Sequence, residues 1–269
     1  MNVDAELKSC CAAAYESDFA RLLLGDSFHP GGLALTERLG QLLAFSPRDH
    51  VLDVASGRGE SALFLARRFG CRVTGIDFGA ANIAQAASRA EEANVADLVR
   101  FELGDAERLQ QPDAAFDAIL CECAFCTFPE KRIAAGEFAR VLRPGGRLGL
   151  SDLTRSGTLP SELSGLLAWI ACIGDARPAG EYVEYLDHSG FESIAVEAHD
   201  AALTQMLRDV QGRMLAAELM VKLNQLSLPG VDFEQAKATA ACAAEAIRSG
   251  LLGYSLITAR QPEAERARP

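Results

Sequence analysis

The sequence lacks the features of several protein classes. Its 269 residues contain 26 Lys and Arg against 37 Asp and Glu, a formal net charge of −11. Binding to nucleic-acid phosphates depends on clustered Lys and Arg, and no basic stripe is present, so we expect no nucleic-acid partner. No stretch approaches the roughly 18 uninterrupted apolar residues of a membrane-spanning helix. The start, MNVDAELKSC, carries acidic residues where a secretion signal has a basic segment. We therefore predict a cytoplasmic protein with no membrane partner.

Paired cysteine motifs are also missing, although cysteine itself is frequent. The single CxxC step runs from Cys123 to Cys126, whereas a structural zinc site uses two such pairs. A disulfide framework is not expected in a cytoplasmic protein. The eight cysteines are Cys10, Cys11, Cys71, Cys121, Cys123, Cys126, Cys172 and Cys242. Cysteine often packs as a small apolar side chain, and that role is the simplest expectation for most of them.

The sequence does contain a regular alternation of strand and helix patterns. Short apolar runs typical of strands lie at 50–54, 72–76, 98–103, 116–121 and 147–153, and helical patterns lie between them at 60–69, 80–94 and 129–142. Strands separated by helices of this length form right-handed βαβ units. We therefore predict an α/β fold with a doubly wound, mostly parallel sheet covered by helices on both faces.

Other patterns flank this core and complete the predicted fold. Helical segments precede the first strand at 4–24 and 31–45, and two more, at 201–225 and 233–249, separate strand-like runs at 191–197 and 253–260. The predicted sheet therefore has seven strands, with an N-terminal helical cover and a C-terminal helical insertion. No linker divides the chain, so we expect one domain over 1–269. It consists of a helical cover (1–47), a cofactor-binding core (48–155), and substrate-side helices with the last two strands (156–269).

Small and acidic residues follow the first three predicted strands. Residues 51–59 read VLDVASGRG, which is a strand, a tight turn and the start of a helix. Small residues let a ligand approach the backbone, and a helix N-terminus offers free N–H groups. Asp77 ends the second strand, where a carboxylate can accept both hydroxyls of a ribose. Asp105 follows the third strand, in position for an adenine amino group. These turns share the carboxyl edge of the sheet and therefore form one crevice.

This ordered set resembles the class I S-adenosylmethionine-dependent methyltransferases over residues 48–155. The resemblance implies a Rossmann-like methyltransferase fold and S-adenosyl-L-methionine as the cofactor. It implies that Gly57 and Gly59 lie near the methionine part, Asp77 at the ribose and Asp105 at the adenine. Ala55 departs from the family, which usually has a glycine there. The expected cofactor-binding residues are Asp53, Ala55, Ser56, Gly57, Gly59, Asp77, Phe78, Asp105, Ala106 and Cys121.

Two alternatives to a methyl donor site are open at this point. A nicotinamide dinucleotide site has the fingerprint G-x-G-x-x-G, and this chain has Ala62 at the third glycine. The acidic residues in and after the motif favour the methyl donor, because S-adenosylmethionine has no pyrophosphate to accommodate beside Asp53. The other alternative is a cofactor-binding protein without catalysis, whose helical cover contacts a partner.

Thiols mark the predicted acceptor end of the crevice. The stretch 116–152 resembles the arsenite methyltransferases, which have a cysteine after the fourth strand and then an acidic residue and a lysine, here Cys123 and Glu130-Lys131. Cys172, followed by a small-residue turn and a helix, matches a second cysteine of that family. Thiolates bind soft ions, including trivalent arsenic. The resemblance therefore implies that Cys123 and Cys172 are the catalytic residues and bind the metalloid.

The third cysteine of that family is missing, because no cysteine lies between residues 12 and 70. Cys10, Cys11 or an external thiol such as glutathione is the expected replacement. The alternative acceptor is a small organic metabolite methylated on oxygen, nitrogen, sulfur or carbon, with Glu122 or His29 as the base. The sequence does not indicate an oligomeric state. Further candidates for lining the substrate pocket are Trp169, Tyr182 and Tyr185.

Overall fold

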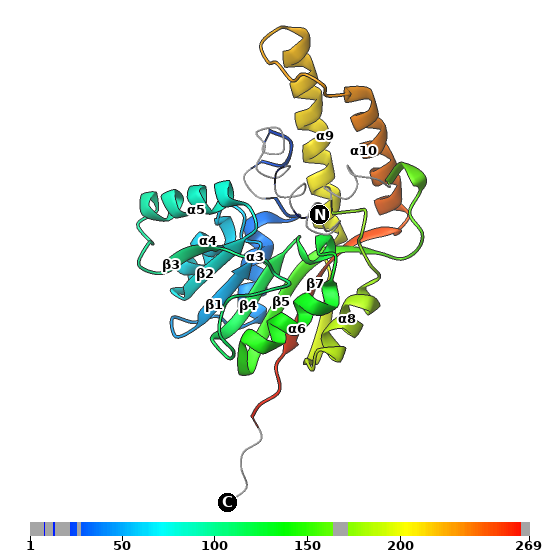
Figure 1. Ribbon diagram of the computed structural model, residues 1–269. Coiled ribbons are helices and arrows are strands. Elements are labelled where there is room, and N and C mark those ends of the chain that lie inside the picture. Colours follow the sequence, from blue (N-terminus) through cyan, green and yellow to red (C-terminus); the bar gives the residue numbers. More distant parts are fainter. Residues whose placement is uncertain (1–7, 9–12, 14–21, 26–27, 164–171, 265–269) are drawn as a thin grey trace, which may run out of the picture.

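Seven strands form one twisted sheet in a computed structural model, which describes residues 8, 13, 22–25, 28–163 and 172–264. The strands are β1 (His50–Val54), β2 (Arg72–Asp77), β3 (Val99–Leu103), β4 (Phe116–Glu122), β5 (Leu142–Arg155), β6 (Glu192–Ala198) and β7 (Leu252–Arg260). Their order is β3-β2-β1-β4-β5-β7-β6 (Figure 1). Strands β1 to β5 are parallel, and β7 is antiparallel to both β5 and β6. The predicted mostly parallel, seven-stranded sheet is confirmed.

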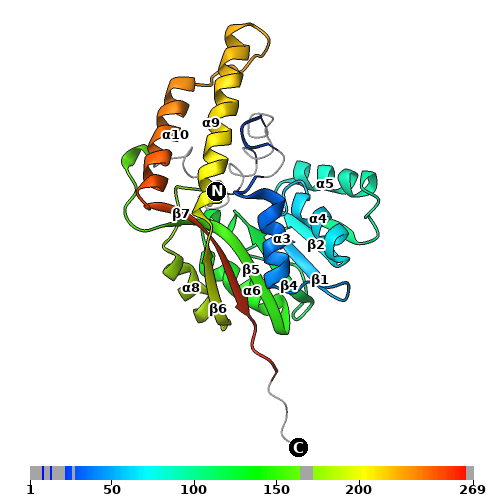
Figure 2. The same cartoon turned by 180° about the vertical axis from the view of Figure 1, so that it is seen from behind.

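Helices cover both faces of this sheet. They are α3 (Gly32–Leu42), α4 (Glu60–Phe69), α5 (Ala80–Glu92), α6 (Lys131–Val141), α8 (Ala179–His188), α9 (Asp200–Lys222) and α10 (Phe233–Arg248). Helices α6 and α8 pack together on the face seen in Figure 1, whereas α3, which packs against α4, lies on the face seen in Figure 2. Because both faces are covered, the central strands are apolar without alternation: Val51 and Leu52 in β1, and Ile119 and Leu120 in β4, are fully buried.

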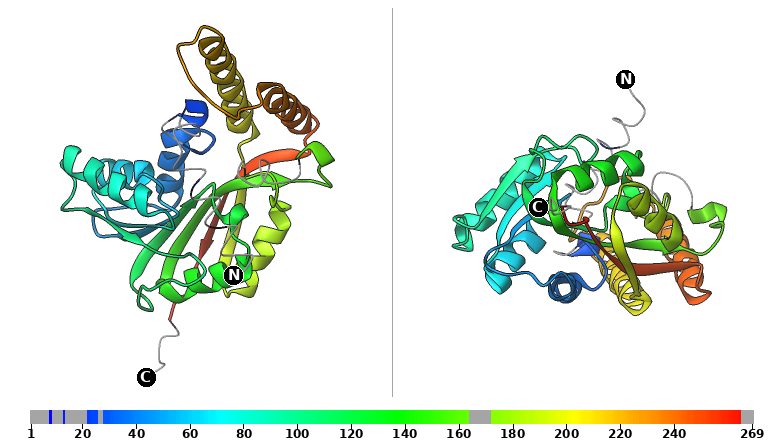
Figure 3. Two further views of the ribbon diagram at one scale, coloured as in Figure 1. Left: turned by 45° about the horizontal axis from the view of Figure 1, so that its top comes forward. Right: turned by 90° about the horizontal axis from the view of Figure 1, so that it is seen from below.

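Helices α9 and α10 form a hairpin that projects beyond the sheet (Figure 3). This hairpin connects β6 to β7, and β7 begins where the parallel strands end, so it stands at their carboxyl edge. The Asp232 side chain accepts a hydrogen bond of 2.9 Å from the Gln235 N–H and caps α10. None of the helices among these described residues has the length and apolarity needed to cross a bilayer.

One strand boundary differs from the sequence-based expectation, and one predicted helix stays untested. Strand β5 begins at Leu142, five residues before the predicted start at 147, because Leu142 pairs with Phe116 ahead of the Pro-Gly-Gly turn. Most of the predicted helix at 4–24 lies outside the described residues.

Candidate functional site

A cavity lies at the carboxyl edge of the sheet, at the ends of β1, β2 and β4 and the loop that follows β3. Most of the residues assigned to the cofactor from the sequence line it, together with one of the two candidate thiols. These are Asp53, Ala55, Ser56, Gly57, Asp77, Phe78, Asp105, Ala106 and Cys123. Gly59, Cys121 and Cys172 are not among the lining residues. The predicted crevice therefore exists, and its composition differs from the expected one at three positions.

The turn after β1 is held in left-handed backbone conformations. Ala55 and Gly57 have φ values of 58° and 51°, and a Cβ atom on Gly57 would have no neighbour within 4 Å. Gly57 therefore leaves open space on the cavity side, where a ligand can approach the main chain. Gly59 has another role, because a Cβ atom there would lie 2.5 Å from the Phe101 ring. A side chain at this position would therefore clash with β3, and the contact of Gly59 with the cofactor stays a prediction.

Asp77 organises the turns that follow β1 and β2. Its carboxylate accepts hydrogen bonds of 2.8 Å from the Gly57 N–H, 2.8 Å from the Gly79 N–H and 3.1 Å from the Asn82 amide. It is largely buried, and it borders the cavity. Asp77 therefore fixes the Gly57 turn relative to β2, in addition to any contact with a ligand.

Several buried polar atoms around the cavity have no hydrogen-bond partner among the described residues. They are Asp53 Oδ2, Ser56 Oγ, Arg58 Nε and Asn82 Oδ1, and all four residues line the cavity. Such orphan atoms are rare in protein interiors, because each one costs about 1–3 kcal/mol when it is left unpaired. Their concentration at one cavity indicates a site built for a polar ligand.

Carboxyl groups dominate the charge of this cavity. Asp53, Asp77 and Glu122 all line it. Burial, followed by the nearby charges of Glu122 and Asp77, raises the pKa of Asp53 well above its ordinary value. A cationic ligand would relieve this repulsion, whereas a pyrophosphate would increase it.

Lys8 contacts the carboxylate that follows β3. Its Nζ lies 2.9 Å and 2.8 Å from the two oxygens of Asp105 and also contacts Glu107. Burial opposes the charge of Lys8, but these hydrogen bonds and charges raise its pKa above the ordinary value. The pairing spans 97 residues, so no local sequence pattern indicates it.

The two candidate thiols lie together. The Cys172 thiol donates a hydrogen bond of 3.2 Å to the Cys123 carbonyl oxygen, and its side chain is also hydrogen-bonded to those of Cys123 and Cys126. Cys123 and Cys172 both have left-handed φ values, 52° and 61°, which are uncommon for residues other than glycine. The Cys172 side chain and burial raise the pKa of Cys123 well above its ordinary value, so its thiol is protonated at neutral pH.

Asp152 lies behind these thiols at the end of β5, and the sequence analysis did not identify it. It accepts hydrogen bonds of 2.8 Å from the Cys126 N–H and 2.9 Å from the Leu153 N–H. Burial, with a contribution from Cys172, raises the pKa of Asp152 to about 7. The sequence signal for Asp152 is its position near the carboxyl end of a central strand. Cys121, by contrast, is fully buried in the hydrophobic core.

Glu122 and His29 form a second polar group in the cavity. The Glu122 carboxylate accepts hydrogen bonds from the hydroxyls of Thr36, at 3.0 Å, and Ser61. His29 Nε2 lies 3.6 Å from Glu122 Oε2, and only 8% of the His29 side chain and 4% of the Glu122 side chain are exposed. This carboxylate–imidazole pair is suited to removing a proton from a bound hydroxyl or amine.

Other predicted residues fall outside this site. The Tyr182 side chain is fully buried, and its hydroxyl donates to the Leu153 carbonyl at 3.1 Å, so Tyr182 belongs to the core. Tyr185 lies on α8 and stacks against Arg132, and it does not line the cavity. Cys10, Cys11 and Trp169 lie outside the described residues. Within the described ranges, no three His, Cys, Asp or Glu side chains are grouped to hold a metal ion.

Comparison with known proteins places this geometry in a wider context. A family model described as "Methyltransferase domain" matches residues 51–146. The chain is 32% identical over 233 residues to 27-O-demethylrifamycin SV methyltransferase of Amycolatopsis mediterranei, covering 85% of this chain and 83% of that protein.

Two further similarities concern a more distant relative and a solved structure. The chain is 28% identical over 169 residues to an arsenite methyltransferase of Halobacterium salinarum, which covers 62% of this chain but only 43% of that protein. The solved structure is the phosphoethanolamine N-methyltransferase 2 of Haemonchus contortus with phosphomonomethylethanolamine and S-adenosylhomocysteine. It superposes with a TM-score of 0.79 at 18% identity, covering 96% of this chain and 61% of that one.

Proposed function

Because this chain belongs to the class I S-adenosylmethionine-dependent methyltransferases, we propose that the acceptor of its methyl group is trivalent arsenic held by Cys123 and Cys172. The chain is a methyltransferase of small molecules, with S-adenosylmethionine as the cofactor. The observation that carries the proposal is the contact between the two thiols, since Cys172 is hydrogen-bonded to Cys123 and Cys123 lines the cavity of the cofactor residues.

The described residues fit the cofactor. S-adenosylmethionine is a cation, and it supplies an electrophilic sulfonium methyl group to a lone pair on the acceptor. The buried carboxyl groups of Asp53 and Glu122 favour that positive charge, and the orphan atoms of Asp53 and Ser56 offer it polar contacts. Asp77 would hold the ribose, and Asp105 the adenine. A carboxylate has about four acceptor positions, and Lys8 and the Glu107 N–H use three of those on Asp105.

The protonation state of the thiols supports arsenic over a soft metal cation. A hydrogen bond with Cys172 and burial raise the pKa of Cys123, so Cys123 is a neutral thiol at pH 7, and the Cys172 thiol carries the proton that it donates to the Cys123 carbonyl oxygen. A divalent cation would have to expel their protons. Arsenous acid instead carries hydroxyl groups, so that As(OH)₃ and two thiols give two As–S bonds and two water molecules with no net proton release. The third arsenic ligand is then a remaining hydroxyl or an external thiol.

The test is a methyl-transfer assay with arsenite, S-adenosylmethionine and glutathione, in which methylated arsenic is separated and quantified. We expect turnover by the native protein and its loss in Cys123→Ser and Cys172→Ser. Cys242→Ser is the matched control, because Cys242 is a half-buried thiol on α10 away from the cavity. The proposal is wrong if the native protein produces no methylated arsenic, or if the double Cys123→Ser/Cys172→Ser variant retains the full rate.

A hydroxyl of a small organic molecule is the second candidate acceptor, and the Glu122–His29 pair favours it. This pair lines the same cavity and could accept the hydroxyl proton. The relative that aligns over 85% of this chain is named 27-O-demethylrifamycin SV methyltransferase, which is an activity on an organic molecule. Glu122→Gln separates the two candidates if it retains S-adenosylhomocysteine affinity. It should abolish transfer to an organic acceptor, but leave transfer to arsenic, whose lone pair needs no base.

A further inference from the structure

Lys131 occupies an electrostatically unfavourable position. It is the first residue of α6, where the helix dipole is positive and an acidic residue is usually preferred. Its side chain is only 4% exposed, so its ammonium group is also largely removed from water. A buried ammonium group costs several kcal/mol unless it is paired and hydrogen-bonded. The structure must therefore provide partners for Lys131, and their location indicates what the residue does.

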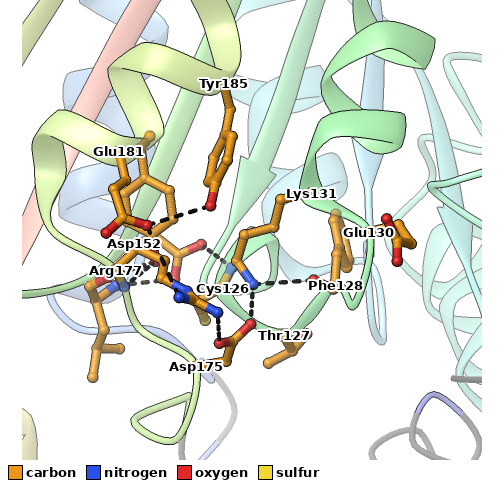
Figure 4. A network of polar contacts seen from close by, with 12 residues as sticks. Cys126, Thr127, Phe128, Glu130, Lys131, Asp152, Asp175, Arg177, Glu181 and Tyr185 are labelled. Atoms are coloured by element: carbon orange, nitrogen blue, oxygen red, sulfur yellow. Dashed lines mark hydrogen bonds and ion pairs between the residues drawn. The ribbon is translucent and has the colours of Figure 1, made fainter. Parts of the chain in front are cut away.

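The partners of Lys131 belong to the two loops that carry the candidate thiols (Figure 4). Its Nζ donates a hydrogen bond of 3.0 Å to the carbonyl oxygen of Phe128, in the segment that runs from Cys123 to α6. Nζ also forms an ion pair with Asp175, three residues after Cys172. The Lys131–Asp175 ion pair therefore joins the Cys123 segment, which runs from Cys123 to the start of α6, to the Cys172 loop, which runs from Cys172 to α8.

The Cys172 loop has a second ion pair that serves as an internal comparison. Arg177 also binds Asp175 and lies 3.9 Å from Glu181 on α8, so two cations and two anions alternate along the network in Figure 4. Asp175 and Arg177 belong to the same loop, however, and their pairing does not connect it to the Cys123 segment. Removing Lys131 deletes one ion pair and removing Arg177 deletes two, but only the loss of Lys131 removes the bridge.

We propose that Lys131 and Asp175 are positioning residues that hold the Cys172 thiol against the Cys123 segment. The biological purpose of this positioning rests on the proposed function, since a metalloid needs both sulfur atoms at once. The physical claim is only that the Lys131–Asp175 bridge keeps the two thiols close together. Without the bridge the Cys172 loop samples more positions, and the effective concentration of one thiol at the other falls.

The experiment measures thiol proximity without arsenic and without turnover. The azo compound diamide oxidises two thiols to a disulfide and takes up both hydrogens, and peptide mapping by mass spectrometry follows formation of the Cys123–Cys172 disulfide. We expect Lys131→Met to slow it by at least about tenfold, which corresponds to about 1.4 kcal/mol. The matched control, Arg177→Met, removes the other cation that binds Asp175 and should stay within about twofold of the native rate, because the Lys131–Asp175 bridge remains in this variant.

Additional variants keep the test decisive if Lys131→Met folds poorly. Lys131→Arg retains the charge and should recover most of the native rate, and Asp175→Asn should slow disulfide formation as Lys131→Met does. Calorimetric binding of S-adenosylhomocysteine should remain within about twofold in all variants, because the bridge lies outside the cofactor cavity. A native oxidation rate in Lys131→Met, or equal slowing in Arg177→Met, would overturn the inference.

The outcome is independent of whether arsenic is the true acceptor. A native protein that does not methylate arsenite but shows the expected loss of thiol pairing would refute the proposed function alone. If arsenite is the acceptor, Lys131→Met should raise the KM for arsenite and leave the KM for S-adenosylmethionine unchanged. A purely structural role would lower stability in Lys131→Met and Arg177→Met alike, without this separation of the two KM values.

Discussion

The replacement of Asp152 by Asn should change how the stability of the protein depends on pH. Asp152 is 1% exposed at the end of β5, beside the thiol group of the site. Asn has nearly the same shape and keeps one oxygen to accept the hydrogen bond from the Cys126 N–H, which measures 2.8 Å. The variant therefore removes the ionisable group with little change in packing.

The sign and size of the effect follow from the pKa of Asp152, which burial raises from 3.8 to about 7 in the folded state. The folded protein binds this proton more tightly than the unfolded chain, so the native protein loses stability as pH rises from about 4 to about 7. The difference of about 3 pH units corresponds to about 4 kcal/mol in total. About 2 kcal/mol of this should be lost between about pH 5 and pH 7, and little more above pH 8.

Urea unfolding of the native protein and of Asp152→Asn across this pH range measures the effect. The free energy of unfolding of the native protein, relative to the variant, should decrease as pH rises. Asp117→Asn is the matched control. Burial raises the pKa of Asp117, but hydrogen bonds from the His50 N–H and Arg143 outweigh burial, so the pKa of Asp117 lies below its ordinary value. Its stabilising contribution is lost only below about pH 4, so it should show no such trend. A difference between native and Asp152→Asn that stays constant with pH would refute the reasoning.

Three further predictions concern the cofactor cavity. Gly57→Ala should weaken S-adenosylhomocysteine binding at least about tenfold, because it adds a methyl group to the open space beside the turn. Calorimetry measures this, and the helical control Gly136→Ala should bind normally. Equal affinities of Gly57→Ala and Gly136→Ala would contradict this account. Ala55→Gly should raise the free energy of unfolding by about 0.5–1 kcal/mol, because relief of a left-handed φ of 58°, about 1–2 kcal/mol, exceeds the unfolded-state entropy cost of glycine, about 0.4–1 kcal/mol. A loss of similar size in urea unfolding would refute that explanation. Asp77→Asn should reduce S-adenosylhomocysteine affinity by about tenfold or more through lost acceptor capacity, and an unchanged dissociation constant would remove Asp77 from the proposed ribose site.

The sheet could be predicted from the sequence because its causes are local. The apolar runs of β1 and β4 and the helical pattern of α4 appear within ten residues each, and all three were predicted within one residue of their observed ends. The small and acidic residues that follow β1, β2 and β3 could likewise be predicted to lie close together, because parallel strands end at one edge of the sheet. Cys172 contacts Cys123, the other cysteine that the family resemblance selected, and the role of the two thiols in arsenic binding stays a prediction.

The features that sequence reasoning missed depend on contacts between distant segments. Lys8 binds Asp105, which lies 97 residues further along the chain, and Lys131 binds Asp175, which lies 44 residues further along. Gly59 was assigned to the cofactor because the turn is rich in glycine, but the reason for a glycine there is the Phe101 ring, which belongs to β3. Cys121 was predicted to bind the cofactor, but β4 is covered on both faces and buries this side chain. Local periodicity contains none of this information.

Crystals grown with S-adenosylhomocysteine and soaked with arsenite test the central claim most directly, through anomalous diffraction at the arsenic absorption edge. We predict a single strong arsenic peak bonded to the sulfur atoms of Cys123 and Cys172, in the same cavity as the adenosine. An arsenic peak on other cysteines only, or adenosine bound away from Asp77 and Asp105, would contradict the account.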